Sequence, residues 1–195
     1  MIDDGLLSGL RTRIRELIAI GEPDGFDRIV EWAMDHVGAP AQSRTTAEQM
    51  VHDEFAAHAA AQATWPAVTD NDRLDTAFRE LDEAGIVARQ CFTCCNSCGN
   101  LEIGDEVPDG ATARGFTFYH LQDAERALSG DGLYLAHGYF EGDIAAPGPA
   151  DPVAIGREIA ATLRRHGLTV LWNGDVKTKI HVPFGWQRRQ VSAHP

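Results

Sequence analysis

Apolar residues recur every three or four positions through the first part of the chain, a spacing that places side chains on one face of an α-helix. The pattern covers residues 7–18, resumes over 26–37 after a break rich in glycine and proline, and continues over 46–63. It ends at Trp65-Pro66, because the residue before a proline is pushed out of helical geometry. We therefore predict an N-terminal helical region over residues 1–66.

The remaining residues, 67–195, alternate between the helical spacing and short runs of aromatic and β-branched residues that are typical of strands. Helices are predicted over 74–84, 121–128 and 153–163, and strands over 86–93, 115–120, 133–140, 168–172 and 179–182. The pair Asn173-Gly174 predicts a turn between the last two strands. Strands interleaved with helices indicate a two-layer α+β domain with a mixed sheet, preceded by the N-terminal helices.

Composition and charge narrow the class of protein. The 195 residues are 44% hydrophobic and 24% charged, as in a globular protein. The net charge of −12 repels phosphate backbones and argues against general nucleic-acid binding. No apolar run approaches the roughly 18 residues that span a bilayer, and the first residues are acidic rather than basic. We therefore expect no membrane span and no secretory signal, and we predict a cytoplasmic protein.

The four cysteines lie within one short segment, Cys91-Phe92-Thr93-Cys94-Cys95-Asn96-Ser97-Cys98-Gly99. In a cytoplasmic chain such crowding favours metal ligation or thiol chemistry over a structural disulfide framework. The form Cys95-x-x-Cys98-Gly99 is that of a zinc knuckle, in which two sulfurs approach one ion and the glycine permits a tight turn. The segment therefore predicts a thiolate metal site, with zinc as the first candidate ion.

The sequence indicates the complete set of metal ligands less directly than it indicates the metal site. Cys91-x-x-Cys94 offers a second pair at the same spacing, and no other C-x-x-C pair exists in the sequence. Adjacent side chains on a strand point to opposite faces, so Cys94 and Cys95 would not easily share one ion there. A histidine from another strand would then complete the site. The candidates, in order, are His120, His137 and His181.

Two other interpretations of the cysteines stay open. Either C-x-x-C pair could cycle between a dithiol and a disulfide. Redox proteins usually place this motif at a helix N-terminus. Here Gly99-Asn100 follows the motif and no amphipathic pattern comes after it, which argues against a helix. Phe92-Thr93 also argues against a helix, because these residues favour a strand. A helix would line one face with sulfur and suit a soft ion such as copper(I). Alternatively, the cysteines are reduced thiols packed as small apolar side chains.

Several motifs of the second region are shared with a known family. They are Phe92-Thr93-Cys94-Cys95-x-x-Cys98-Gly99, Phe118-Tyr119-His120-x-Gln122-Asp123, Gly132-Leu133-Tyr134-Leu135-Ala136, Trp172-x-Gly174 and Trp186-Gln187-Arg188-Arg189. Through them the chain, from about Asp72 to Arg189, resembles an uncharacterised family of bacterial proteins of unknown function. The family motif implied by the resemblance is C-C-x-x-C-G, which includes Cys94, Cys95 and Cys98 and leaves Cys91 as an addition.

The last part of the chain, with its strand, loop, helix, strand and Trp172-x-Gly174, is also similar to the regulator of ribonuclease activity B. This second resemblance implies a ferredoxin-like arrangement of the α+β domain and a non-catalytic, acidic module that binds a protein partner. Neither resemblance implies an enzymatic activity.

The sequence thus predicts a cytoplasmic protein with a zinc-type site. The predicted metal ligands are Cys94, Cys95, Cys98 and His120. The alternatives are a thiol-based redox protein or enzyme that uses the C-x-x-C cysteines, and an interaction or regulatory module.

Overall fold

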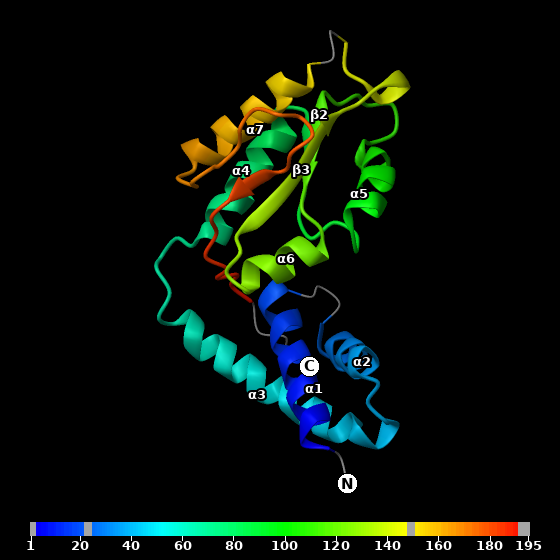
Figure 1. Cartoon of the computed structure of the whole chain (residues 1–195), viewed down its shortest axis with the longest axis vertical. Helices are drawn as coiled ribbons and strands as arrows, with labels where there is room; N and C mark the ends of the chain where they lie inside the picture. The colour runs from blue at the N-terminus through cyan, green and yellow to red at the C-terminus, as the bar shows by residue number, and fades with distance from the viewer. Residues whose placement is uncertain (1–2, 22–24, 148–150, 191–195) are drawn as a thin grey trace. The chain divides into compact units, whose positions relative to one another are not determined.

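The computed structural model describes residues 3–21, 25–147 and 151–190. The chain divides into two compact units (Figure 1), one made of Met1–Thr69 together with Gln187–Pro195 and the other of Asp70–Trp186. The second unit is therefore inserted, in sequence, between the two parts of the first.

The first unit, which we call the helical unit, contains three α-helices and a 3-10 turn among its described residues. They are α1 (Asp4–Ile20), α2 (Gly25–Val37), η1 (Ala41–Ser43) and α3 (Arg44–Gln62). The apolar faces expected from the spacing form its core, which includes Leu10, Ile14, Leu17, Ile29, Val30, Ala33 and Val51. The predicted N-terminal helices are confirmed. The returning segment is held by hydrogen bonds between Arg188 O and His58 Nε2 (3.1 Å) and from Gln190 N to Gln62 Oε1 (2.9 Å).

The second unit, which we call the α/β unit, is built on a four-stranded mixed sheet. Its elements are α4 (Asp70–Glu83), β1 (Ile86–Arg89), α5 (Asn96–Glu102), η2 (Ile103–Glu106), β2 (Gly115–Phe118), α6 (Leu121–Leu128), β3 (Leu133–Tyr139), η3 (Gly142–Ile144), α7 (Pro152–Arg165) and β4 (Ile180–Val182). The strands lie in chain order; β1 and β2 are parallel, and the other neighbours are antiparallel. The predicted α+β class is confirmed. In a ferredoxin-like domain the βαβ unit is split by another strand, whereas β1 and β2 are neighbours here, so the observed order refines that expectation.

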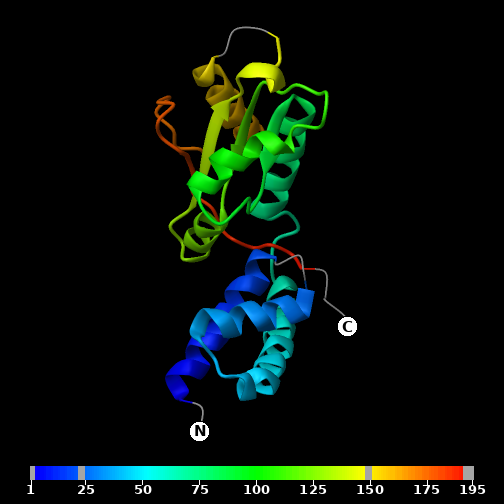
Figure 2. The same cartoon turned by 90° about the vertical axis from the view of Figure 1, so that its right-hand side faces the viewer.

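The two faces of the sheet are covered by different helices. Gly115 faces α7, because a Cβ built on it would lie 2.9 Å from Ile155. Phe118 points to the opposite face, since residues an odd number of positions apart in a strand alternate, and there it packs against Gly99 of α5. Figure 1 shows α4 and α7 on one side of the sheet and α5 on the other, and in Figure 2 α5 lies in front of the strands. A small aromatic core, which includes Phe92, Phe116, Phe118 and Phe140, fills the α5 side.

All five predicted strands are shorter than expected, and two of them differ most. The strand predicted over 86–93 ends at Arg89, because Cys91 (φ 48°) and Thr93 (φ 59°) take the left-handed backbone conformation. The strand predicted over 168–172 is reduced to one bridge between Leu171 and His181.

The cause of the second difference lies in the loop that follows. There the Asn173 side chain accepts the backbone N–H of Asp175, and the Asp175 side chain accepts that of Lys177, each at 2.9 Å. These local turns replace a tight hairpin. Among the described residues, none of the helices has the length and apolar character needed to cross a bilayer.

Candidate metal centre

The cysteine segment is anchored at the edge of the sheet where β1 and β2 end. Because these strands are parallel, their carboxyl ends meet at one edge, and the residues that follow them lie side by side. Two backbone hydrogen bonds join them, from Phe92 N to Tyr119 O (2.8 Å) and from Leu121 N to Thr93 O (3.2 Å). The loop that carries the cysteines is thus fixed to the segment between β2 and α6.

Within this loop the backbone turns sharply and enters α5. Thr93 takes a left-handed conformation, and its hydroxyl donates to the carbonyl oxygen of Cys95 at 3.1 Å. Cys95 is extended (φ −154°, ψ 170°) and immediately precedes the first residue of α5, so Cys98 lies in the first turn of that helix. The expectation that these cysteines continue a strand is therefore wrong. The argument against a cysteine motif at a helix N-terminus is wrong for the same reason.

This turn brings three sulfurs together. The Sγ atoms of Cys94, Cys95 and Cys98 all lie within 4.8 Å of one another, and those of Cys94 and Cys98 are 3.7 Å apart. Two sulfurs that each lie about 2.3 Å from a tetrahedral zinc ion are about 3.8 Å apart. We call these three residues the cysteine group. Cys94 is exposed and the other two are partly exposed, so the group faces solvent on one side.

Gly99 sets the position of the helix that carries Cys98. A Cβ on Gly99 would lie only 2.4 Å from the Phe118 ring, so α5 can approach the sheet this closely only with glycine at this position. Phe92 packs edge-on against the same ring, with its centroid 5.8 Å from that of Phe118. The glycine that ends the C-C-x-x-C-G motif therefore serves close packing, not the tight turn predicted from the sequence.

The convergence of the thiols shifts their pKa values in opposite directions. The backbone N–H of Cys98 lowers the pKa of the Cys95 thiol, and the Cys98 and Cys94 thiols add to this effect, although Cys95 makes no full capping hydrogen bond. Contact with the sulfurs of Cys94 and Cys95 raises the pKa of Cys98 to about 11. Neighbouring thiols thus compete for negative charge, and a bound cation would relieve the repulsion among three thiolates.

His120 lies in a different set of contacts. Its Nε2 atom is 3.0 Å from Asp123 Oδ2 and 3.1 Å from Lys179 Nζ, and Lys179 Nζ donates to the same carboxylate oxygen at 2.7 Å. Among the described residues, the group of convergent ligand atoms contains the three cysteines and does not include His120. We call His120, Asp123 and Lys179 the polar cluster.

Two of the three residues of the polar cluster are buried, the Lys179 side chain is 26% exposed, and the opposite charges of the cluster are paired. Asp123 is 0% exposed and His120 3%, and the Lys179 ammonium balances the Asp123 carboxylate. Burial lowers the pKa of His120; Asp123 opposes this shift and Lys179 adds to it. The imidazole is therefore neutral near pH 7.

Sequence reasoning missed Lys179 because it lies far from the other two residues in the chain and no motif marks it. The two remaining histidine candidates contact other parts of the fold. His137 Nε2 is 3.2 Å from Thr178 O and its ring packs edge-on to Trp172, while His181 stacks on Tyr134 with ring centroids 4.5 Å apart. Neither histidine belongs to the group of convergent ligand atoms that the described residues contain.

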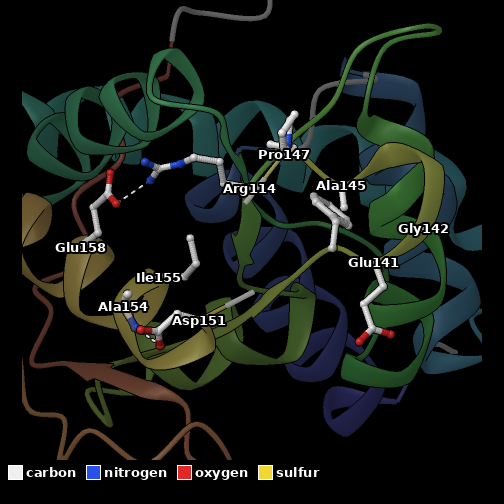
Figure 3. Close-up of a pocket in the computed structure, with 11 residues that line it drawn as sticks. Arg114, Glu141, Gly142, Ala145, Pro147, Asp151, Ala154, Ile155 and Glu158 are labelled. Atoms are coloured by element: carbon white, nitrogen blue, oxygen red, sulfur yellow. Dashed lines mark hydrogen bonds and ion pairs between the residues drawn. The ribbon is translucent and has the colours of Figure 1, made fainter. Parts of the chain in front are cut away.

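A hollow of about 480 Å³ lies elsewhere in the α/β unit, between the start of α7 and the end of β3 (Figure 3). Its charged groups already have partners. Arg114 pairs with Glu158 at 2.5 Å, Asp151 caps α7 through the Ala154 N–H at 2.9 Å, and Glu141 accepts from the Tyr139 hydroxyl at 2.9 Å. The charged groups of this hollow are thus engaged within the protein, whereas the cysteine group is a set of side chains that could bind a metal ion.

Comparisons with known proteins give the family of the chain. A family described as a domain of unknown function, DUF6891, matches residues 3–190, so the chain belongs to that family. Comparisons with curated proteins and with solved structures give no significant match.

Proposed function

We propose that Cys94, Cys95 and Cys98 bind one thiophilic metal ion, zinc in the first place, as three thiolates. The observation that supports this most directly is the convergence of three sulfurs within 4.8 Å, two of them 3.7 Å apart. Thiolates are ligands that zinc and other soft ions prefer. A reducing cytoplasm, the location we propose, keeps the thiols available.

The fourth ligand decides what kind of centre this is. A structural zinc site is closed by four protein ligands, whereas a site with three protein ligands leaves one position for an external molecule. His120 is the fourth ligand predicted from the sequence, but it does not belong to the group of convergent ligand atoms that the described residues contain, and its Nε2 atom contacts Asp123 and Lys179. Because its burial and contacts favour the polar cluster, we propose an open centre with a solvent molecule in the fourth position.

Metal binding to the reduced full-length chain tests the proposal. Elemental analysis should give one zinc ion per chain, and cobalt(II) in its place should show the absorption of thiolate-to-metal charge transfer. At about 100 times its Kd, zinc should raise the free energy of unfolding by about 2.7 kcal/mol. A chelator should remove this gain.

Single substitutions then identify the ligands. Cys94→Ser, Cys95→Ser and Cys98→Ser should each weaken zinc binding by more than about 100-fold, because even residues that only support ligands cost 10–100-fold. Cys91→Ser is the matched control and should bind as the parent does. His120→Ala separates an open centre, with unchanged affinity, from one closed by histidine, with weakened affinity. Zinc binding that survives the three ligand substitutions would refute the proposal.

A further inference from the structure

We infer that Cys94 and Cys98 form a reversible disulfide when a hydroperoxide reaches the cysteine group. The inference deepens the proposed function, because two of the three thiolates would then be lost to the metal. Oxidation and metal binding would exclude each other at this site.

The distance between the two sulfurs favours this pair. Cys94 Sγ and Cys98 Sγ are 3.7 Å apart, so they need to approach by less than about 2 Å to reach a disulfide bond length. The sulfurs lie on different elements. Cys94 belongs to the loop before α5, whereas Cys98 belongs to the first turn of that helix. A small rotation in the loop can therefore close the bond without unwinding the helix.

Packing determines which partner can move. The ring of Phe118 lies against Gly99, and this contact holds the neighbouring Cys98 in place on the sheet. Cys94 is exposed; its neighbour Thr93 is held by Leu121 at the start of α6, and its own side chain contacts Cys98 Sγ. Cys94 is thus the sulfur that a solvent-borne oxidant meets first, and Cys98 is the sulfur positioned to react with the oxidised product.

The chemistry balances with a hydroperoxide as the oxidant. The Cys94 thiolate attacks the peroxide, the O–O bond breaks, and a sulfenic acid and an alcohol form, with a proton supplied by solvent. The Cys98 thiol then attacks the Cys94 sulfur and passes its proton to the leaving hydroxide, so that the S–S bond forms, the S–O bond of the sulfenic acid breaks and water leaves. In total, two thiols and one hydroperoxide give a disulfide, an alcohol and water. A bound ion would slow the first step because it occupies the sulfur lone pairs.

The experiment uses the full chain, metal-free and reduced, treated with hydrogen peroxide. We expect the loss of two titratable thiols per chain, a Cys94–Cys98 cross-link by peptide mapping, and recovery of both thiols with a dithiol reductant. Cys95→Ser and Cys91→Ser should still form the cross-link, whereas Cys94→Ser and Cys98→Ser should not. In the zinc-loaded chain, one zinc ion should be released for each disulfide formed.

A cross-link to Cys91 or Cys95 in the parent chain would overturn the inference, as would oxidation that stops at sulfinic acid or links two chains. The proposed function fails separately: a chain that binds no zinc refutes the metal site, while the thiol count and peptide map still decide the disulfide. A chain that binds zinc through the three cysteines but forms no Cys94–Cys98 cross-link refutes this inference alone.

Discussion

The cysteine group and the polar cluster lie in the same α/β unit, on the residues that follow two adjacent strands, yet they are built in opposite ways. The cysteine group comes from one short stretch of chain, faces solvent on one side and gathers thiols that compete for negative charge. The polar cluster joins residues as distant as His120 and Lys179, is mostly buried, and pairs a cation with an anion.

The difference indicates which of the two needs an external partner. Negative charges that converge repel one another unless a cation lies among them, whereas opposite charges that converge are already compensated. The cysteine group is therefore the candidate for ligand chemistry. We assign the polar cluster a supporting role, joining the start of α6 to the residue before β4.

The largest effect that separates the two regions is expected for Lys179→Met. The substitution removes the nearest cation of the Asp123 carboxylate, which is 0% exposed, and leaves Arg126 Nη1 at 3.8 Å. Because the Lys179 side chain is 26% exposed, we expect a loss of about 3 kcal/mol, the lower end of the cost of breaking a buried pair. Urea denaturation should show this loss, and zinc affinity should stay unchanged. Lys177→Met is the control, since that lysine lies in the same loop and is exposed. A loss below about 1 kcal/mol would mean that the polar cluster contributes little to stability.

Gly99→Ala should have a smaller effect on stability, but it should also change the position of the cysteine group. The added methyl group would lie 2.4 Å from the Phe118 ring, and such overpacking costs about 1–3 kcal/mol. Since α5 must shift to relieve it, zinc affinity should fall as well. The control is Gly104→Ala, whose Cβ would meet Ile144 at 3.4 Å. If zinc affinity is the same in both variants, the Gly99 contact does not position Cys98.

Lowering the pH of the metal-free chain should have the smallest effect. The folded state lowers the pKa of His120, first by burial and further by Lys179 and Arg126, against the opposing Asp123 and Glu125. Its contribution to stability is therefore present above pH 6.5, its ordinary pKa, and is lost as the pH falls from there toward the folded pKa. The loss is at most about 1.4 kcal/mol for each pH unit.

Thermal melts between pH 7.5 and pH 5 measure this effect. His137, whose pKa is also lowered by burial, contributes with the same sign, so a decline should remain in His120→Gln but with a smaller slope. A slope identical to that of the parent chain would show that His120 does not contribute.

Much of the fold could be predicted because it depends on patterns of residues that are close together in the sequence. The spacing of Leu10, Ile14 and Leu17 defines a helix face whatever lies against it. The adjacency of Cys94, Cys95 and Cys98 in the sequence marks the segment, but the convergence of their sulfurs requires the turn into α5. Helix α5 could not be predicted, because only seven residues form it and its stability comes from the contact between Gly99 and Phe118. Lys179 could not be predicted either, since its place depends on how β4 pairs with β3.

The insertion of one unit within the sequence of the other has a consequence for synthesis. The α/β unit is complete when Trp186 has left the ribosome, before Arg188 and Gln190 can reach His58 and Gln62. Domains generally fold as units in the order in which they emerge, the N-terminal one first. In this chain the helical unit begins first and is completed last, so its helices must persist without their closing segment while the whole of the other unit is translated.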